Sequence, residues 1–217
     1  MQQENYDIVA MTEAWWGDSH NWSAARDGYK LFRRDRQGRR DRVVALYVRE
    51  CFDCLELDDG DNRVECSWVR IRAKANTVDT MMGVSYRPPN QDEEANEIFY
   101  KKLREVSQSL AFVLMGDFNL PEVYWKQNTV EKKQSRRFLE CVEDDNFLTQ
   151  LVRETTREGV PLDLLFANRE GLVGYVTVGG HLGHSGHEVT EFSILREVRG
   201  GASRTATLGF WRADWPV

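Results

Sequence analysis

One stretch constrains the fold more than any other: residues 111–119, with the sequence Ala-Phe-Val-Leu-Met-Gly-Asp-Phe-Asn. A short apolar run that is bounded by polar sequence and preceded by a long amphipathic pattern is typical of a buried strand. Because side chains alternate along a strand, Asp117 and Asn119 point to the same side where the strand ends. Ligands usually bind at that edge of an open α/β sheet, which makes both residues candidates for a site. The alternative is that the side chains of Asp117 and Asn119 form hydrogen bonds within a turn.

Apolar runs of strand length alternate with helical patterns along the chain, which predicts an α/β fold. Apolar residues recur at helical spacing over residues 92–110, and a second helix is expected over residues 135–144. The length of 217 residues is enough for a sizeable core. The other predicted strands cover residues 8–11, 43–48, 68–72, 81–86, 161–166, 176–178 and 191–195.

Asp163 is the one charged residue in the apolar run of residues 161–166. A carboxylate inside a buried strand is costly unless it is paired. The sequence therefore predicts a partner for it, either a histidine or an arginine. His187, just before the last predicted strand, is a candidate.

Glu13 and Tyr86 also follow or end predicted strands. A carboxylate at the position of Glu13 can ligate a metal ion, although a strand-terminal glutamate is most often merely solvated. The hydroxyl of Tyr86 either reaches a phosphate group or caps the core.

Arginines are concentrated in residues 26–42, where Tyr29 and Phe32 are interleaved with them. Arginine mixed with aromatic residues can follow a phosphate backbone, whereas a solvated hairpin tip is the alternative. The net charge of −6 argues against a protein that coats nucleic acid over its whole surface, but it allows a local basic patch. The candidate DNA-binding residues are Arg33, Arg34, Arg36, Arg39 and Arg40.

Two further patterns resemble metal sites but do not predict one. Cys51 and Cys54 have the spacing of a zinc ligand pair, yet a structural zinc site needs a second pair and only one more cysteine lies nearby. His181, His184 and His187 recur every three residues, but the glycines between them oppose a helical alignment.

The first residues are polar and acidic, which excludes a signal peptide there, and no apolar run approaches the ~20 residues that cross a bilayer. We therefore expect a protein that is neither secreted nor in a membrane, located in the nucleus or the cytoplasm. In a reducing compartment the four cysteines are expected to be free thiols.

The chain contains, in order, the motifs Thr12-Glu13-x-Trp15-Trp16, Tyr86-Arg87-Pro88-Pro89, Gly116-Asp117-Phe118-Asn119, Leu162-Asp163-Leu164-Leu165 and His184-Ser185-x-His187-Glu188. Together these five motifs resemble the endonuclease/exonuclease/phosphatase superfamily, whose fold is a four-layer α/β/β/α sandwich (DNase I-like). They are most similar to the apurinic-like endonuclease domain of non-LTR (LINE-type) retrotransposons of the chicken-repeat clade. The resemblance implies an endonuclease domain over residues 1–198, followed by a poorly ordered tail over residues 199–217.

The resemblance also implies roles for these residues and for their partners. Asp117 would orient and deprotonate the attacking water, and Asn119 would hold that carboxylate and the phosphate in place. Asp163 would fix the tautomer of His187, which would donate to the phosphate oxygens as negative charge builds.

Magnesium and double-stranded DNA are the cofactor and the substrate that the resemblance implies. Glu13 would ligate Mg²⁺, and Tyr86 would contact the phosphate. The nick in double-stranded DNA would leave a 3′-hydroxyl that primes the reverse transcriptase of the parent element, which lies outside this chain.

Two departures from the family pattern predict impaired or absent activity. The family reads Ser-Asp-His where this chain has Ser185-Gly186-His187, and the absent carboxylate helps to hold the metal. The family also opens with a strand that carries an active-site Asn, whereas this chain begins directly before the strand of Glu13, so we expect that first strand to be missing. Two alternatives remain: a non-catalytic DNA-binding or interaction remnant, and a phosphomonoesterase of the same superfamily.

Overall fold

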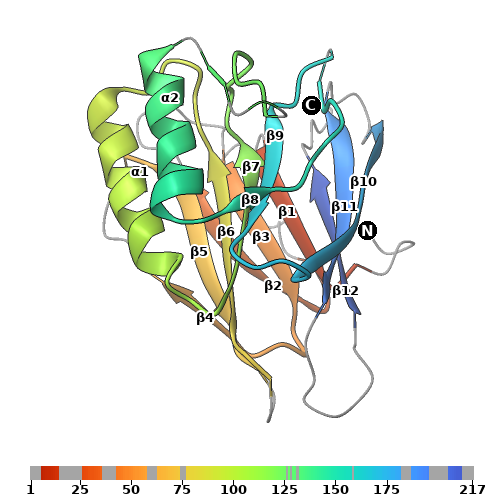
Figure 1. Cartoon of the computed structure of the whole chain (residues 1–217). Helices are drawn as coiled ribbons and strands as arrows, with labels where there is room; N and C mark the ends of the chain where they lie inside the picture. Colours follow the sequence, from red (N-terminus) through yellow and green to blue (C-terminus); the bar gives the residue numbers. More distant parts are fainter. Residues whose placement is uncertain are drawn as a thin grey trace.

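Two six-stranded sheets make up the computed structural model and lie face to face (Figure 1). The structure describes residues 6–14, 26–35, 43–57, 63–73, 77–125, 127, 129–130, 132–157, 159–181, 187–195 and 205–211. The α/β sandwich with a DNase I-like arrangement, expected from the sequence, is confirmed.

One sheet, called the β4–β9 sheet below, has the strand order β4-β5-β6-β7-β9-β8. Its central strands β6 and β7 run parallel, and α1, Glu93–Val106, connects them. All the other pairs in this sheet are antiparallel. The strands are β4 (Cys54–Leu57), β5 (Glu65–Ile71), β6 (Thr80–Tyr86), β7 (Ala111–Asp117), β8 (Thr149–Gln150) and β9 (Asp163–Ala167).

The second sheet has the order β10-β11-β12-β1-β3-β2. Its strands are β1 (Ile8–Ala14), β2 (Tyr29–Asp35), β3 (Val43–Arg49), β10 (Val173–His181), β11 (Glu188–Leu195) and β12 (Thr205–Trp211).

The strand β12 corrects part of the expectation that residues 199–217 form a poorly ordered tail. Thr205–Trp211 lies in the interior of the second sheet, antiparallel to β11 and parallel to β1. Its backbone therefore forms hydrogen bonds with a strand on each side. The glycines and charged residues of this segment do not indicate such pairing. As a consequence β1, which carries Glu13, has a hydrogen-bonded neighbour on each side.

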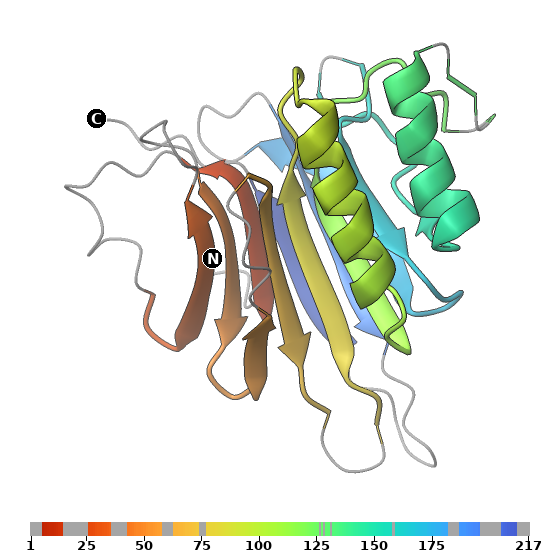
Figure 2. The same ribbon diagram turned by 90° about the vertical axis from the view of Figure 1, so that its left-hand side faces the viewer.

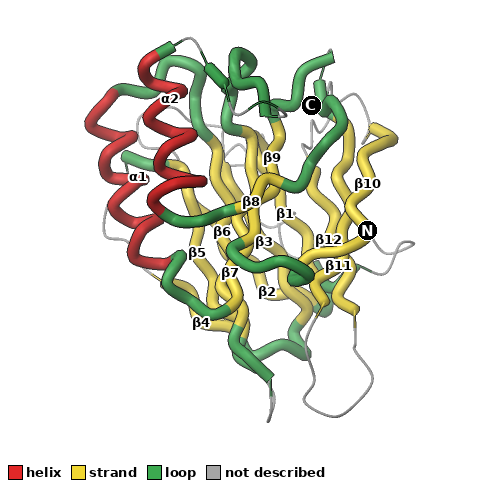
Figure 3. Tube along the Cα trace, viewed as in Figure 1, coloured by secondary structure: helices red, strands yellow, loops and turns green. Residues whose placement is uncertain are grey.

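The helices described by the structure all cover the outer face of the β4–β9 sheet (Figures 2 and 3). Asp92 caps α1 by accepting a hydrogen bond from the backbone N–H of Ala95, at 2.7 Å, as an N-cap aspartate does. The expected helix over residues 92–110 is thus present but ends at Val106. None of the described helices is long and apolar enough to span a bilayer.

The second helix differs from its prediction in its form. The structure has α2 at Lys133–Leu139, and a π-helical segment, Glu140–Asp145, continues it. Phe138 of α2 lies in an aromatic cluster between the helices and the sheet, 5.1 Å from Phe118 and 6.2 Å from Phe166 between ring centroids. The inner faces of the two sheets form a separate apolar core, which includes Ile8, Leu46, Val84, Met115, Leu165 and Phe192.

The aromatic cluster should dominate the stability of the helical layer. Phe138 is 1% exposed, so we expect Phe138→Ala to lower the free energy of unfolding by about 3–5 kcal/mol through lost burial and a residual cavity. Phe147, which follows the π-helical segment, is 80% exposed. Phe147→Ala should therefore change the free energy of unfolding by less than about 0.5 kcal/mol. Urea denaturation followed by circular dichroism measures both, and equal losses would contradict this assignment of the core.

Candidate active site

Four polar side chains lie side by side at one end of the β4–β9 sheet. Glu65 of β5 is opposite Tyr86 of β6, Tyr86 is opposite Asp117 of β7, and Asp117 is opposite Asp163 of β9. Opposed residues of neighbouring strands point to the same face, and Tyr86 belongs to the core between the sheets. The row therefore faces the inside of the sandwich at its edge.

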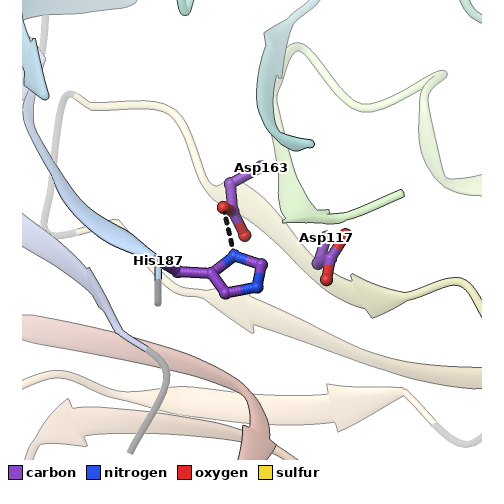
Figure 4. Close-up of side chains that lie close together, drawn as sticks. All are labelled: Asp117, Asp163 and His187. Carbon is purple, nitrogen blue, oxygen red and sulfur yellow. Dashed lines mark hydrogen bonds and ion pairs between the residues drawn. The ribbon is translucent and has the colours of Figure 1, made fainter. Parts of the chain in front are cut away.

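Asp163 meets His187, which lies directly before β11 of the other sheet. The Nδ1 atom of His187 is 2.7 Å from Oδ2 of Asp163, and the two residues are 3% and 2% exposed (Figure 4). The contact expected from the lone carboxylate in an apolar strand is present. Because an ionised carboxylate only accepts, the hydrogen of this bond belongs to Nδ1.

Asp117 is buried beside this pair, and the loop after it holds its carboxylate. The backbone N–H of Asn119 donates to Oδ1 of Asp117, at 3.0 Å. The side-chain amide of Asn119 instead donates to the carbonyl oxygen of Arg87, at 2.9 Å. Asn119 has a φ of +48°, a conformation that asparagine tolerates better than most residues. The main chain of Asn119 thus positions the carboxylate of Asp117.

The glycine before Asp117 is required by the closeness of β6. A Cβ atom on Gly116 would lie 1.8 Å from the carbonyl oxygen of Ser85, which is backbone and cannot move aside. Glycine therefore lets β7 approach β6 at the point where the candidate site begins.

Arg87 is a buried cation that links the strand ends to α1, and its role was not predicted from the sequence. Its backbone N–H donates to the carbonyl of Asp117 at 2.8 Å, and its guanidinium donates to the carbonyl of Phe118 at 3.4 Å and to Oδ1 of Asn96 at 3.3 Å. Burial lowers the pKa of Arg87. In the sequence, its position between a buried strand and two prolines could have indicated a structural role.

Thr156 is the second residue that sequence reasoning missed. Its hydroxyl oxygen accepts from the backbone N–H groups of Leu162, at 3.0 Å, and Asp163, at 2.9 Å. Its carbonyl accepts from the N–H of Glu188 at 2.9 Å. One fully buried residue thus positions the chain at both Asp163 and His187. No periodic pattern around it could have indicated this, because the contacts depend on how the loop folds.

The sequence matches the model of the Endonuclease/Exonuclease/phosphatase family over residues 1–192. The chain belongs to this family. No curated protein sequence matches it at a significant level.

Solved structures of the same fold include the endonuclease domain of TRAS1, a telomere-specific non-LTR retrotransposon. It aligns with a TM-score of 0.70 at 18% identity, over 89% of this chain and 87% of its own. The AP endonuclease LMAP of Leishmania major aligns with a TM-score of 0.61 at 12% identity, over 87% and 78%. The catalytic domain of human Nocturnin, solved with a sulfate anion, gives 0.56 at 13%, over 87% and 81%. At these identities the likeness concerns the fold.

The structure describes the remaining candidate residues of this family member only in part. Glu13 is part of β1, but its side chain is outside the described residues. Arg33 and Arg34 lie half-buried on β2, four strand positions from β11 and hence about 19 Å across the sheet. Tyr86 is beside Asp117 but only 2% exposed. The described residues do not include Arg36, Arg39 and Arg40.

The residues of this family member also fit a divalent cation. Asp117, Asp163 and His187 each offer a ligand atom, and these atoms lie within 4.8 Å of one another. Among the described residues nothing hydrogen-bonds to the buried Oδ1 atom of Asp163. A buried carboxylate oxygen without a partner suits a cation, and oxygen ligands suit hard cations. Because Nδ1 of His187 is bonded to Asp163, the two carboxylates are the better ligands.

Thr156 provides a test of how the site is positioned. Thr156→Val keeps the shape but removes the oxygen that two backbone N–H groups use, so we expect the free energy of unfolding to fall by about 1–3 kcal/mol for a buried group left unpaired. Thr156→Ser keeps the oxygen and should lose less. Urea denaturation of the three proteins checks this, and a larger loss for serine would show that the methyl group matters more than the hydroxyl.

Proposed function

We propose that this chain is the Mg²⁺-dependent DNA endonuclease domain of a LINE-type retrotransposon, and that Gly186 impairs its hydrolysis of the phosphodiester bond. The observation that carries the proposal is the buried pair of Asp163 and His187 beside Asp117, at a strand end of a family member. The ordered motifs of the sequence and the similarity of fold to the TRAS1 endonuclease domain support the retrotransposon origin.

Each residue of the pair and its neighbour has a part in this reaction. The carboxylate of Asp117, oriented by the N–H of Asn119, takes a proton from a water molecule that attacks the phosphorus in line. The bond from phosphorus to the 3′ oxygen breaks, and that oxygen becomes a hydroxyl by taking up a proton from solvent. Asp163 holds the ring of His187 so that it faces the phosphate oxygens. The hydroxyl of Tyr86 contacts the phosphate as well.

Magnesium would be held by Glu13 together with the carboxylates of Asp117 and Asp163. When bound, it neutralises the scissile phosphate and stabilises the leaving oxygen. The family pattern has an additional carboxylate where this chain has Gly186, and glycine offers no ligand atom. We therefore propose weak binding of Mg²⁺. Double-stranded DNA is the proposed substrate, and the nick would prime the reverse transcriptase of the parent element in the nucleus or cytoplasm.

Restoring the carboxylate should restore activity. Since a positioned metal ion stabilises the transition state by several kcal/mol, we expect Gly186→Asp to nick supercoiled plasmid about 100-fold faster than the parent chain in Mg²⁺. EDTA, or the further change His187→Ala, should abolish the nicking. Gel electrophoresis of the relaxed product measures the rate.

The alternatives give different results in the same experiment. If a folded Gly186→Asp protein retains duplex DNA in a gel shift but never nicks it, the chain is a binding remnant. If it releases phosphate from a small phosphomonoester and leaves the plasmid intact, it is a phosphomonoesterase. Either result would overturn the endonuclease proposal, and circular dichroism confirms that each variant is folded.

A further inference from the structure

Arg157 directs a positive charge at the ring nitrogen of His187 that faces away from Asp163. Its Nη1 atom lies 3.2 Å from Nε2 of His187. Among the described residues no carboxylate lies within ion-pair distance of this half-buried guanidinium. Because a histidine ring carries no negative charge, this contact leaves the positive charge of the guanidinium available to an anion.

The backbone of Arg157 is fixed before any ligand arrives. Its N–H donates to the carbonyl of Val160 at 3.1 Å, and the N–H of Val160 donates back at 2.8 Å. Gly159 closes this turn at a φ of +84°, which glycine adopts without strain. The adjacent Thr156 bonds to Asp163, so the cation and the catalytic pair are held by one loop.

The contact with His187 also assigns the direction of hydrogen bonding. A guanidinium only donates, and Nδ1 already carries the hydrogen that Asp163 accepts, so Nε2 meets Arg157 with its lone pair. In this arrangement Nε2 has no hydrogen to offer to a phosphate oxygen, whereas Arg157 has several. A phosphate oxygen that approaches His187 therefore meets the N–H groups of Arg157 first.

We infer that Arg157 binds the scissile phosphodiester, exchanging its contact with His187 for the phosphate oxygens. This rests on the proposed endonuclease function and adds a residue that contacts the substrate. The planar fork of arginine matches two oxygens of one phosphate, and the negative charge of the phosphodiester neutralises the cation.

Binding of duplex DNA in EDTA tests the inference without relying on turnover. A fluorescein-labelled duplex, titrated at several salt concentrations, should bind to Arg157→Ala about tenfold more weakly than to the parent, with a salt slope smaller by about 0.9 for one lost phosphate contact. Arg157→Lys should keep the slope but bind more weakly than the parent, because lysine lacks the fork.

Arg72→Ala is the charge-matched control. Arg72 follows β5 directly and forms an ion pair with Asp53. It lies at the end of β5 opposite to Glu65, so its replacement should leave both the DNA affinity and the salt slope unchanged. Equal binding by the parent and both Arg157 variants would overturn the role of Arg157 while leaving the endonuclease proposal intact. If no variant, including Gly186→Asp, binds or nicks duplex DNA, both proposals fail. Circular dichroism of Arg157→Lys separates a binding defect from misfolding.

Discussion

The bond between Asp163 and His187 is the interaction on which the site depends, because it joins the two sheets at one edge of the sandwich. Asp163 belongs to β9 of one sheet, and His187 leads into β11 of the other. Both side chains are buried, and a buried carboxylate without a partner would carry the full cost of desolvation. The bond can therefore form only where the two sheets are packed together.

The neighbours of this pair hold it mainly through backbone groups. The hydroxyl oxygen of Thr156 accepts from two main-chain N–H groups, and the guanidinium of Arg87 donates to the carbonyl of Phe118. The main-chain N–H of Asn119 donates to Oδ1 of Asp117. The bonds of Thr156 and Arg87 thus position the backbone at the strand ends without occupying a carboxylate oxygen of the site. Among the described residues nothing hydrogen-bonds to Oδ1 of Asp163, so this buried oxygen is available to a cation.

Much of the fold could be predicted because the residues buried in strands and helices recur at regular spacing along the sequence. The run that ends at Asp117, the helix capped by Asp92 and the need of Asp163 for a partner all follow from local pattern and the cost of burying charge. Thr156 and Arg157 could not be found in this way, since their contacts depend on a turn closed by Val160. The strand β12 was missed because its place depends on pairing with β1 and β11, which are distant in sequence.

The charge of the chain explains why a single arginine can matter at the site. With a net charge of −6, the protein as a whole repels a polyanion, and Asp117 and Asp163 add to that repulsion at the strand ends. A phosphodiester can approach those carboxylates only where a cation offsets them. A bound divalent cation would be one, and Arg157, held by its turn against His187, is another that the chain itself supplies. The weak affinity for metal that we propose from Gly186 would make the site depend more on Arg157.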